Sequence, residues 1–336
     1  MRDRCLIIAE AGVNHNGRLE LAYQLCDAAK DAGADVVKFQ TWKTENLITK
    51  NVAQAEYQRQ NTGQSESQFD MLKKLELSYD NFKKLKAYCD RIGIVFASTA
   101  DEEESLDFLI SLDIPFIKVG SGDIGNVHFL RYIGSKKKPV ILSTGMSTIE
   151  DVNLSIQALK EGGASDISLL HCTTSYPCAY EDVNLKAMRT LRQAFHLPVG
   201  FSDHTIGNDA AVAAVALGAA VVEKHFTLDC GMPGPDHKAS TEPEAFRQLV
   251  HSIRNVEACL GSGEKVPTVK EREIAKVVMK RVVARRNILK GSIFREEDLC
   301  IKRNDTGIPA RFWDECIGKK AIKDISVDEG IILPDT

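Results

Sequence analysis

The sequence predicts an α/β protein: an eightfold parallel (β/α)8 barrel over residues 1–262, a linker over 263–280 and a small β-rich domain over 281–336. Eight short apolar runs, rich in β-branched residues, alternate with eight helix-like segments over about 260 residues, which matches such a barrel in count and length. A doubly wound open sheet is the rival fold, but it usually has fewer strands, and no Gly-x-Gly-x-x-Gly follows the first run. After residue 261 the pattern changes to short strands and glycine turns without a long helix.

Each barrel element is predicted from its hydrophobic pattern. The expected strands are 5–13, 35–41, 94–99, 116–121, 140–145, 167–172, 199–203 and 221–226. The expected helices are 19–32, 79–92, 102–111, 127–133, 149–161, 185–194, 209–217 and 243–260. The connection 42–78 is long for a β/α link, and long loops on the carboxyl side of barrel strands are commonly functional, so we expect an ordered lid there.

Composition excludes several classes of protein. No run of 18 apolar residues occurs, and the first residues enter a strand pattern without a signal-peptide core, so we expect a cytoplasmic protein with no membrane partner. Nine scattered cysteines without a Cys-x-x-Cys pair are typical of reduced thiols, and we interpret Cys172 as a packing thiol. The one basic cluster, 280–286, lacks interleaved aromatic residues, so we expect no nucleic-acid partner.

Two lysines at strand ends indicate an anion site. Barrel interiors are normally apolar, so the charges of Lys38 and Lys118 must find partners or a ligand. One such lysine could form a structural ion pair, but two lysines with nearby Ser and Thr residues favour binding of phosphate or carboxylate. A Schiff-base lysine is the alternative.

Two histidines indicate a metal site. His204 and His225 follow the last two expected strands, so both imidazoles would reach the same space if these strands are parallel neighbours. Asp203 and Glu223 could fix the imidazoles or form plain ion pairs. The loop 231–238, with two prolines and two glycines, brings Asp236 towards this face of the barrel.

The sequence resembles the sialic acid synthase family, which condenses phosphoenolpyruvate with an N-acyl-mannosamine-type sugar. The resemblance spans nearly the whole chain and rests on the motifs IAEAGVNHNG, VKFQT, EYQRQNTGQSESQ, KVGSGD, ILSTGM, LLHCTTSYP, VGFSDHTIG, VEKHFTLD and GPDHKAS. The tail resembles the family's antifreeze-protein-like (SAF) domain, although the usual K-R-P-G-N-G is KRNDTG here. Where members frequently have Glu after K-x-G-S-G, this chain has Asp123.

The resemblance implies a role for each motif residue. His204 and His225 would bind a divalent metal, usually Mn²⁺, with Mg²⁺ and Co²⁺ as alternatives. The residues implied to hold phosphoenolpyruvate are Lys38, Thr99, Lys118, Ser121, Ser143 and Ser202. Those implied to face the sugar are Gln40, Asn61, Tyr176, Asp236 and Arg303, the last reaching a partner chain in a domain-swapped homodimer. Thr174 joins the substrate-binding residues because some members have Asn at the Thr173–Thr174 pair.

We expect a synthase that forms N-acetylneuraminate and phosphate from phosphoenolpyruvate and N-acetylmannosamine. In this reaction Lys118 orients the enol phosphate, the metal polarises the sugar aldehyde, Asp123 orients or deprotonates water, and Glu10 supports the water or the sugar. The alternative sugar is 2,4-diacetamido-2,4,6-trideoxymannose, which gives N,N'-diacetyllegionaminate. From other classes, a metal-dependent pyruvate aldolase or a non-catalytic ice- or glycan-binding protein remains open.

Overall fold

The structure, a computed structural model, describes residues 4–62 and 66–333. The chain divides into two compact units, Met1–Gly261 and Ser262–Thr336. Each unit has its own hydrophobic core, so each is described by itself.

Eight parallel strands of the first unit close into a barrel in chain order, with β1 paired to both β2 and β8. The strands are β1 (Leu6–Gly12), β2 (Val36–Thr41), β3 (Val95–Ala100), β4 (Ile117–Val119), β5 (Val140–Ser143), β6 (Ile167–Cys172), β7 (Val199–Asp203) and β8 (Val221–His225). The predicted barrel is therefore confirmed. Strand β4 is shorter than expected, because the chain leaves it at Gly120 and turns into a 3₁₀ segment, Ser121–Asp123.

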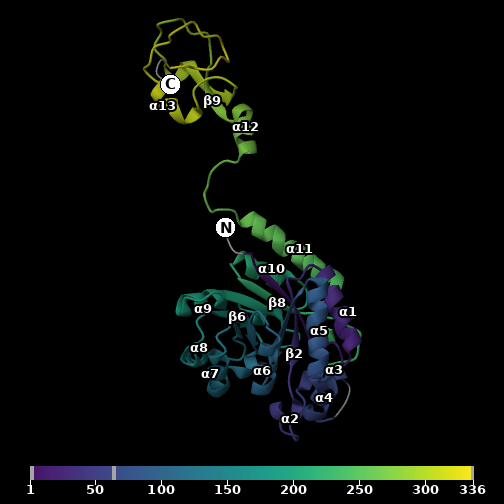
Figure 1. Ribbon diagram of the computed structural model, residues 1–336. Coiled ribbons are helices and arrows are strands. Elements are labelled where there is room, and N and C mark those ends of the chain that lie inside the picture. Colours follow the sequence, from purple (N-terminus) through teal and green to yellow (C-terminus); the bar gives the residue numbers. More distant parts are fainter. Residues whose placement is uncertain (1–3, 63–65, 334–336) are drawn as a thin grey trace. The chain divides into compact units, whose positions relative to one another are not determined.

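Helices surround the strands, as Figure 1 shows for the first unit. They are α1 (Leu19–Asp31), α5 (Tyr79–Ile92), α6 (Glu103–Ser111), α7 (Val127–Ser135), α8 (Ile149–Gly162), α9 (Ala187–Phe195), α10 (Asp209–Ala216) and α11 (Pro243–Leu260). Their apolar stripes pack on the outward-facing side chains of the strands in one continuous core. No helix in residues 4–62 or 66–333 is long and apolar enough to cross a membrane.

The long connection after β2 is ordered by a small core of its own. It contains α2 (Thr44–Leu47), α3 (Glu56–Thr62) and α4 (Gln68–Leu75). Trp42, Met71 and Leu75 pack with Val13 of the loop that follows β1. Residues 63–65, which belong to one of the quoted motifs, lie outside the described residues.

The second unit contains a two-stranded antiparallel sheet of β9 (Lys280–Ala284) and β10 (Leu299–Arg303). Two helices, α12 (Val269–Val278) and α13 (Trp313–Cys316), flank the sheet in sequence. A compact apolar core that includes Val282, Phe294 and Leu299 holds the small domain together. Short strands and glycine turns without a long core helix are what the sequence predicts for this part.

Candidate active site

The period of two along each strand creates a polar layer inside the barrel. Apolar side chains fill the lower interior: Ile8, Val36, Ala97, Phe116, Ile141, Leu170 and Val221. Because successive side chains alternate between the faces of a strand, residues two positions further also point inwards. These residues are Glu10, Lys38, Thr99, Lys118, Ser143, Cys172 and Glu223. The interior thus changes from apolar to polar in one step towards the carboxyl ends of the strands.

This polar layer lines a cavity of about 190 Å³. Twelve residues that the sequence singled out contribute to its wall: Glu10, Lys38, Gln40, Thr99, Lys118, Ser121, Ser143, Thr174, Tyr176, Ser202, His204 and His225. Strand register brings them together; for example, Glu10 lies opposite Lys38 on one neighbour and His225 on the other. The cavity lies where barrel enzymes carry their chemistry.

Both buried lysines form ion pairs and hydrogen bonds in the cavity. Lys38 Nζ lies 2.6 Å from Glu10 Oε2 and 3.7 Å from Glu223 Oε2, and donates to Thr99 Oγ1 at 3.0 Å. Lys118 Nζ lies 3.6 Å from Glu223 Oε1 and donates to Ser143 Oγ at 2.8 Å. Two cations and several hydroxyls around one small cavity form a site suited to a ligand with phosphate or carboxylate oxygens.

The two carboxylates beside the lysines shift in opposite directions: although burial opposes it, the ammonium groups of Lys118 and Lys38 hold the pKa of Glu223 below its ordinary value. Burial raises the pKa of the Glu10 carboxyl to about 7, although the ammonium group of Lys38 opposes the rise. Burial also lowers the pKa of Lys118. An anionic ligand would therefore meet lysines whose charges are only partly compensated in the free protein.

Asp203 and Lys224 form a separate ion pair on the outer face of the barrel wall. Their residues follow the inward-facing Ser202 and Glu223 by one position, so they point the other way. Lys224 Nζ lies 2.7 Å from Asp203 Oδ2 and also donates to the carbonyl of Thr205 at 2.9 Å. In the part of the chain that the structure describes, no hydrogen bond joins Asp203 or Glu223 to an imidazole, so plain ion pairing describes both carboxylates.

The rings of His204 and His225 lie side by side in the wall of the cavity. Their ring centroids are 5.4 Å apart, and the ring of Tyr176 lies 4.2 Å from His204 and 5.5 Å from His225. His204 Nδ1 lies 2.7 Å from the carbonyl oxygen of Thr173, which can only accept, so this nitrogen carries a hydrogen, and in the neutral ring Nε2 is the nitrogen with the lone pair. His225 Nδ1 is buried and has no hydrogen-bond partner among the described residues.

These features fit a divalent metal held by two imidazoles. Burial holds the pKa of His225 well below its ordinary value, which keeps the ring neutral, as metal coordination requires. No group of three or more His, Cys, Asp or Glu side chains in the described residues is arranged to hold a metal ion. The protein would thus supply two ligands and leave the other positions to substrate or water.

Four expected site residues lie outside this cavity wall. Asp123 follows β4 and accepts a hydrogen bond from Asn126 Nδ2 at 3.0 Å. Asn61 of α3 donates to the carbonyl of Pro235 at 2.7 Å, which ties the long connection to the loop that carries the buried Asp236. Arg303 is exposed at the end of β10 in the second unit, opposite Lys280. The sugar-facing roles of Asn61, Asp236 and Arg303 stay predictions.

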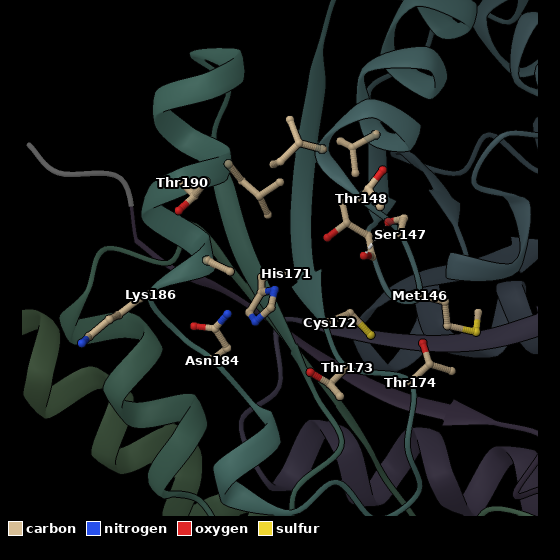
Figure 2. A pocket seen from close by; sticks show the side chains of 15 residues that line it. Met146, Ser147, Thr148, His171, Cys172, Thr173, Thr174, Asn184, Lys186 and Thr190 are labelled. Carbon is tan, nitrogen blue, oxygen red and sulfur yellow. Dashed lines mark hydrogen bonds between the residues drawn. The ribbon is translucent and has the colours of Figure 1, made fainter.

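A larger cavity of about 790 Å³ adjoins the first and shares Met146, Cys172 and Thr174 with it. Figure 2 shows Thr173, Thr174 and Cys172 near one end, with Lys186 and Thr190 of the α9 region on one side and Ser147 and Thr148 on the other. Thr174 Oγ1 is buried and makes no hydrogen bond within the described residues. This hydroxyl is therefore available to a ligand.

Two cavity carboxylates lie outside the residues expected to bind substrate or metal: Asp101, which the sequence did not single out, and Glu223, which was considered only as a partner of the imidazoles or of another charge. The signal that would have found them is the alternation itself. Asp101 follows Ala97 and Thr99 at a spacing of two, and Glu223 follows Val221. Cys172, interpreted as a packing thiol, also lines the cavity on the inward-facing series.

Family models and similar proteins match both units of the chain. The NeuB family model matches residues 25–265, and the SAF domain model matches residues 281–335. N,N'-diacetyllegionaminic acid synthase of Legionella pneumophila is 48% identical over 326 residues, covering 96% of this chain and 92% of the relative. The enzyme of the same name from Campylobacter jejuni is 45% identical over 328 residues, covering 97% of this chain and 98% of the relative.

A solved structure supports the same assignment. The crystal structure of N-acetylneuraminic acid (sialic acid) synthetase from Leptospira borgpetersenii, in complex with citrate, superposes with a TM-score of 0.72 at 31% identity. The match covers 82% of this chain and 91% of that one. The resemblance found in the sequence motifs is confirmed: the chain belongs to the NeuB family and ends in a SAF domain.

Proposed function

We propose that this NeuB-family transferase condenses phosphoenolpyruvate with 2,4-diacetamido-2,4,6-trideoxymannose to give N,N'-diacetyllegionaminate and phosphate. The choice of sugar rests on the relatives at 48% and 45% identity, both named N,N'-diacetyllegionaminic acid synthases. The solved sialic acid synthetase is more distant, at 31% identity. The alternative sugar of the sequence analysis thus becomes the leading proposal, and N-acetylmannosamine becomes the second candidate.

The observation that carries the proposal is the pair of buried lysines beside two imidazoles in one cavity. Lys38 and Lys118 would hold the phosphate and carboxylate of phosphoenolpyruvate, and Thr99 and Ser143, which already bond them, fix their ammonium groups. Held in this way, C3 of the enol phosphate is oriented for attack on the aldehyde carbon of the open-chain sugar.

His204 and His225 would hold the divalent metal, for which we propose Mn²⁺. When bound, such an ion acts as a Lewis acid on a carbonyl oxygen. The chain's own contribution is to bury His225, which keeps that ring neutral, and to fix the ring of His204 through the hydrogen bond from its Nδ1 to the carbonyl of Thr173, which leaves Nε2 to face the metal. A swapped homodimer that brings Arg303 to the partner's barrel, and a cytoplasmic location, belong to the same proposal.

Phosphate release tests this function. Purified protein is incubated with phosphoenolpyruvate, Mn²⁺ and a panel of sugars that contains N-acetylmannosamine and 2,4-diacetamido-2,4,6-trideoxymannose, and phosphate and the nine-carbon product are measured. We expect the highest kcat/KM with the diacetamido sugar and loss of turnover in EDTA that Mn²⁺ restores. Equal or better turnover of N-acetylmannosamine would overturn the choice of sugar, and turnover untouched by EDTA would overturn the metal.

The same experiment separates the other classes. A pyruvate aldolase would form product from free pyruvate and release no phosphate. A glycan-binding protein would bind sugar without turnover, and His204→Ala would leave that binding unchanged.

A further inference from the structure

Asp101 is the first residue after β3 and continues its inward-facing series. Ala97 lies in the apolar interior, Thr99 lies in the polar layer, and Asp101 follows two positions later. Its side chain lines the 190 Å³ cavity together with those of Lys38 and Thr99. A carboxylate therefore lies above the lysine layer, on the side from which a substrate enters.

The carboxylates around the cavity differ in their partners. Glu10 pairs with Lys38 and accepts a hydrogen bond from Gln40 Nε2 at 3.0 Å, and Glu223 lies within 4 Å of both lysines. Asp101 is the acidic cavity residue whose side chain makes no hydrogen bond, and no ion pair within 4 Å, with any residue in 4–62 or 66–333. Glu10 and Glu223 are thus engaged by lysines, whereas the Asp101 carboxylate is free to act on a ligand.

Asp123, the acid expected at this step, has a different position. It lies outside the cavity wall, and its Oδ1 accepts the amide of Asn126 in the turn after β4. A carboxylate that caps a turn in this way has one oxygen already engaged.

We infer that Asp101, rather than Asp123, is the base that takes the proton from the attacking water in the proposed condensation. The inference deepens the proposed function and rests on it. After C3 of phosphoenolpyruvate bonds to the aldehyde carbon, C2 is electron-deficient. A water oxygen then bonds to C2 and one water proton passes to the Asp101 carboxylate, so that C2 carries a hydroxyl and the phosphate. The C2–O bond to phosphate breaks with its electron pair leaving on phosphate, which takes the proton of the C2 hydroxyl as C2 becomes a ketone. The proton on Asp101 goes to the alkoxide oxygen that came from the aldehyde.

The environment of Asp101 suits a group that accepts and returns a proton near neutral pH. Burial raises the pKa of Asp101 to about 7, and the negative charge of Asp123 adds to the rise, while Lys38 opposes it. Burial raises the pKa of Glu10 to a similar value, about 7, so basicity alone does not separate it from Asp101. The difference is geometric: Glu10 Oε2 lies 2.6 Å from Lys38 Nζ and Glu223 Oε1 lies 3.6 Å from Lys118 Nζ, so both of these carboxylates already hold an ammonium group. The place of Asp101 in the cavity and its lack of an ion-pair partner among the described residues therefore both favour it as the base.

The test compares Asp101→Asn with the matched variant Asp123→Asn, because both remove one charge and keep the side-chain shape. Phosphate release gives kcat and KM for the sugar, and calorimetric titration with phosphoenolpyruvate in the presence of Mn²⁺ gives Kd. For Asp101→Asn we expect kcat to fall about 100-fold or more. Its Kd for phosphoenolpyruvate should stay equal or become tighter, because a negative charge beside the anion is lost. Asp101→Glu should recover part of kcat, and Asp123→Asn should lose less than about tenfold.

Three results would overturn the inference. They are a kcat of Asp101→Asn within about threefold of wild type, a loss of phosphoenolpyruvate affinity that accounts for its whole loss of activity, or a larger kcat loss in Asp123→Asn. If the wild-type protein releases no phosphate with any sugar of the panel, the proposed function itself is wrong. If wild type turns over while Asp101→Asn keeps full kcat, only the role of Asp101 fails.

Discussion

Lys118→Met separates the binding of an anion from the stability of the barrel. Methionine keeps the length and apolar stem of lysine but removes the ammonium group. In the structure that group donates to Ser143 Oγ at 2.8 Å and lies 3.6 Å from Glu223, and the side chain is only 3% exposed. The substitution therefore removes one positive charge from the cavity wall and leaves Ser143 free.

In Lys118→Met the free energy of unfolding should change little, whereas the affinity for phosphoenolpyruvate should fall strongly. Burial already lowers the pKa of Lys118, so its charge is costly in the free protein, and Glu223 keeps Lys38 at 3.7 Å. Removing one member of a buried charge pair between protein and ligand costs about 2–5 kcal/mol of binding. This corresponds to a rise in Kd of roughly 30- to 4,000-fold.

Lys224→Met is the matched control. Lys224 is equally buried, but it pairs with Asp203 on the outer face and does not line the cavity. Its removal leaves Asp203 buried without its cation, which costs about 3–5 kcal/mol of stability. We expect lower stability with unchanged affinity for phosphoenolpyruvate.

Urea unfolding measures stability, and calorimetric titration at low temperature measures Kd for phosphoenolpyruvate in both variants. A Kd of Lys118→Met within about threefold of wild type would refute the anion site. Equal losses of affinity in the two variants would refute the distinction between the inward-facing and the outward-facing lysine.

Three further changes test other parts of the molecule. Gly145→Ala should abolish phosphate release without unfolding the barrel, because the new Cβ would contact Thr174 Oγ1 and lie 2.7 Å from Ser121 Oγ; activity near wild type would contradict the close packing of this wall. Thr174→Val removes the hydroxyl that has no partner in the described residues, and KM for the sugar or phosphoenolpyruvate should rise about 2- to 10-fold, whereas unchanged kinetics would exclude a ligand contact. His15 and His237 are buried with pKa values lowered to about 4 from 6.5, mainly by burial, so the unfolded chain binds more protons between these pH values. Each histidine should therefore contribute a loss of about 1.4 kcal/mol of stability per pH unit as pH drops from 6.5 to 4, while the raised pKa values of Glu10 and Asp101 act in the opposite direction. The measurement is the difference between His15→Asn and wild type in urea, which should show one histidine's share of the slope removed; equal slopes would contradict the lowered pKa of His15.

The barrel could be predicted from the sequence because its strands are buried on both sides and read as apolar runs. Strand ends were less predictable, because they depend on turns. The run that begins at Phe116 continues in sequence, but the strand ends at Val119 and the chain turns into the 3₁₀ segment Ser121–Asp123. The helices of the long connection form because Trp42 and Met71 pack together, a tertiary contact that local periodicity does not contain.

The lysine–histidine centre could also be predicted, since polar residues at the ends of apolar runs point to one edge of a parallel barrel. The ion pairs that these residues form could not be predicted. Glu223 and Lys224 are neighbours in sequence, yet one lies between the cavity lysines and the other forms an outer ion pair, because adjacent residues face opposite sides of a strand. Assigning each polar residue to a face, rather than only to a strand end, distinguishes a ligand-binding charge from a structural one.

The same reasoning bears on the water-activating carboxylate. The mechanism expected from the sequence places this role in the segment after β4 on Asp123, which is one methylene shorter than the Glu frequent in the family and accepts a hydrogen bond from Asn126. The inward-facing series points instead to the segment after β3, where Asp101 lines the cavity. Adjacent strands of a parallel barrel deliver their ends to one space, so a carboxylate on either can serve the same reacting carbon. In the proposed mechanism the free carboxylate of Asp101, directly after β3, takes the role of the shorter and hydrogen-bonded Asp123 after β4, and the matched Asn variants decide between the two.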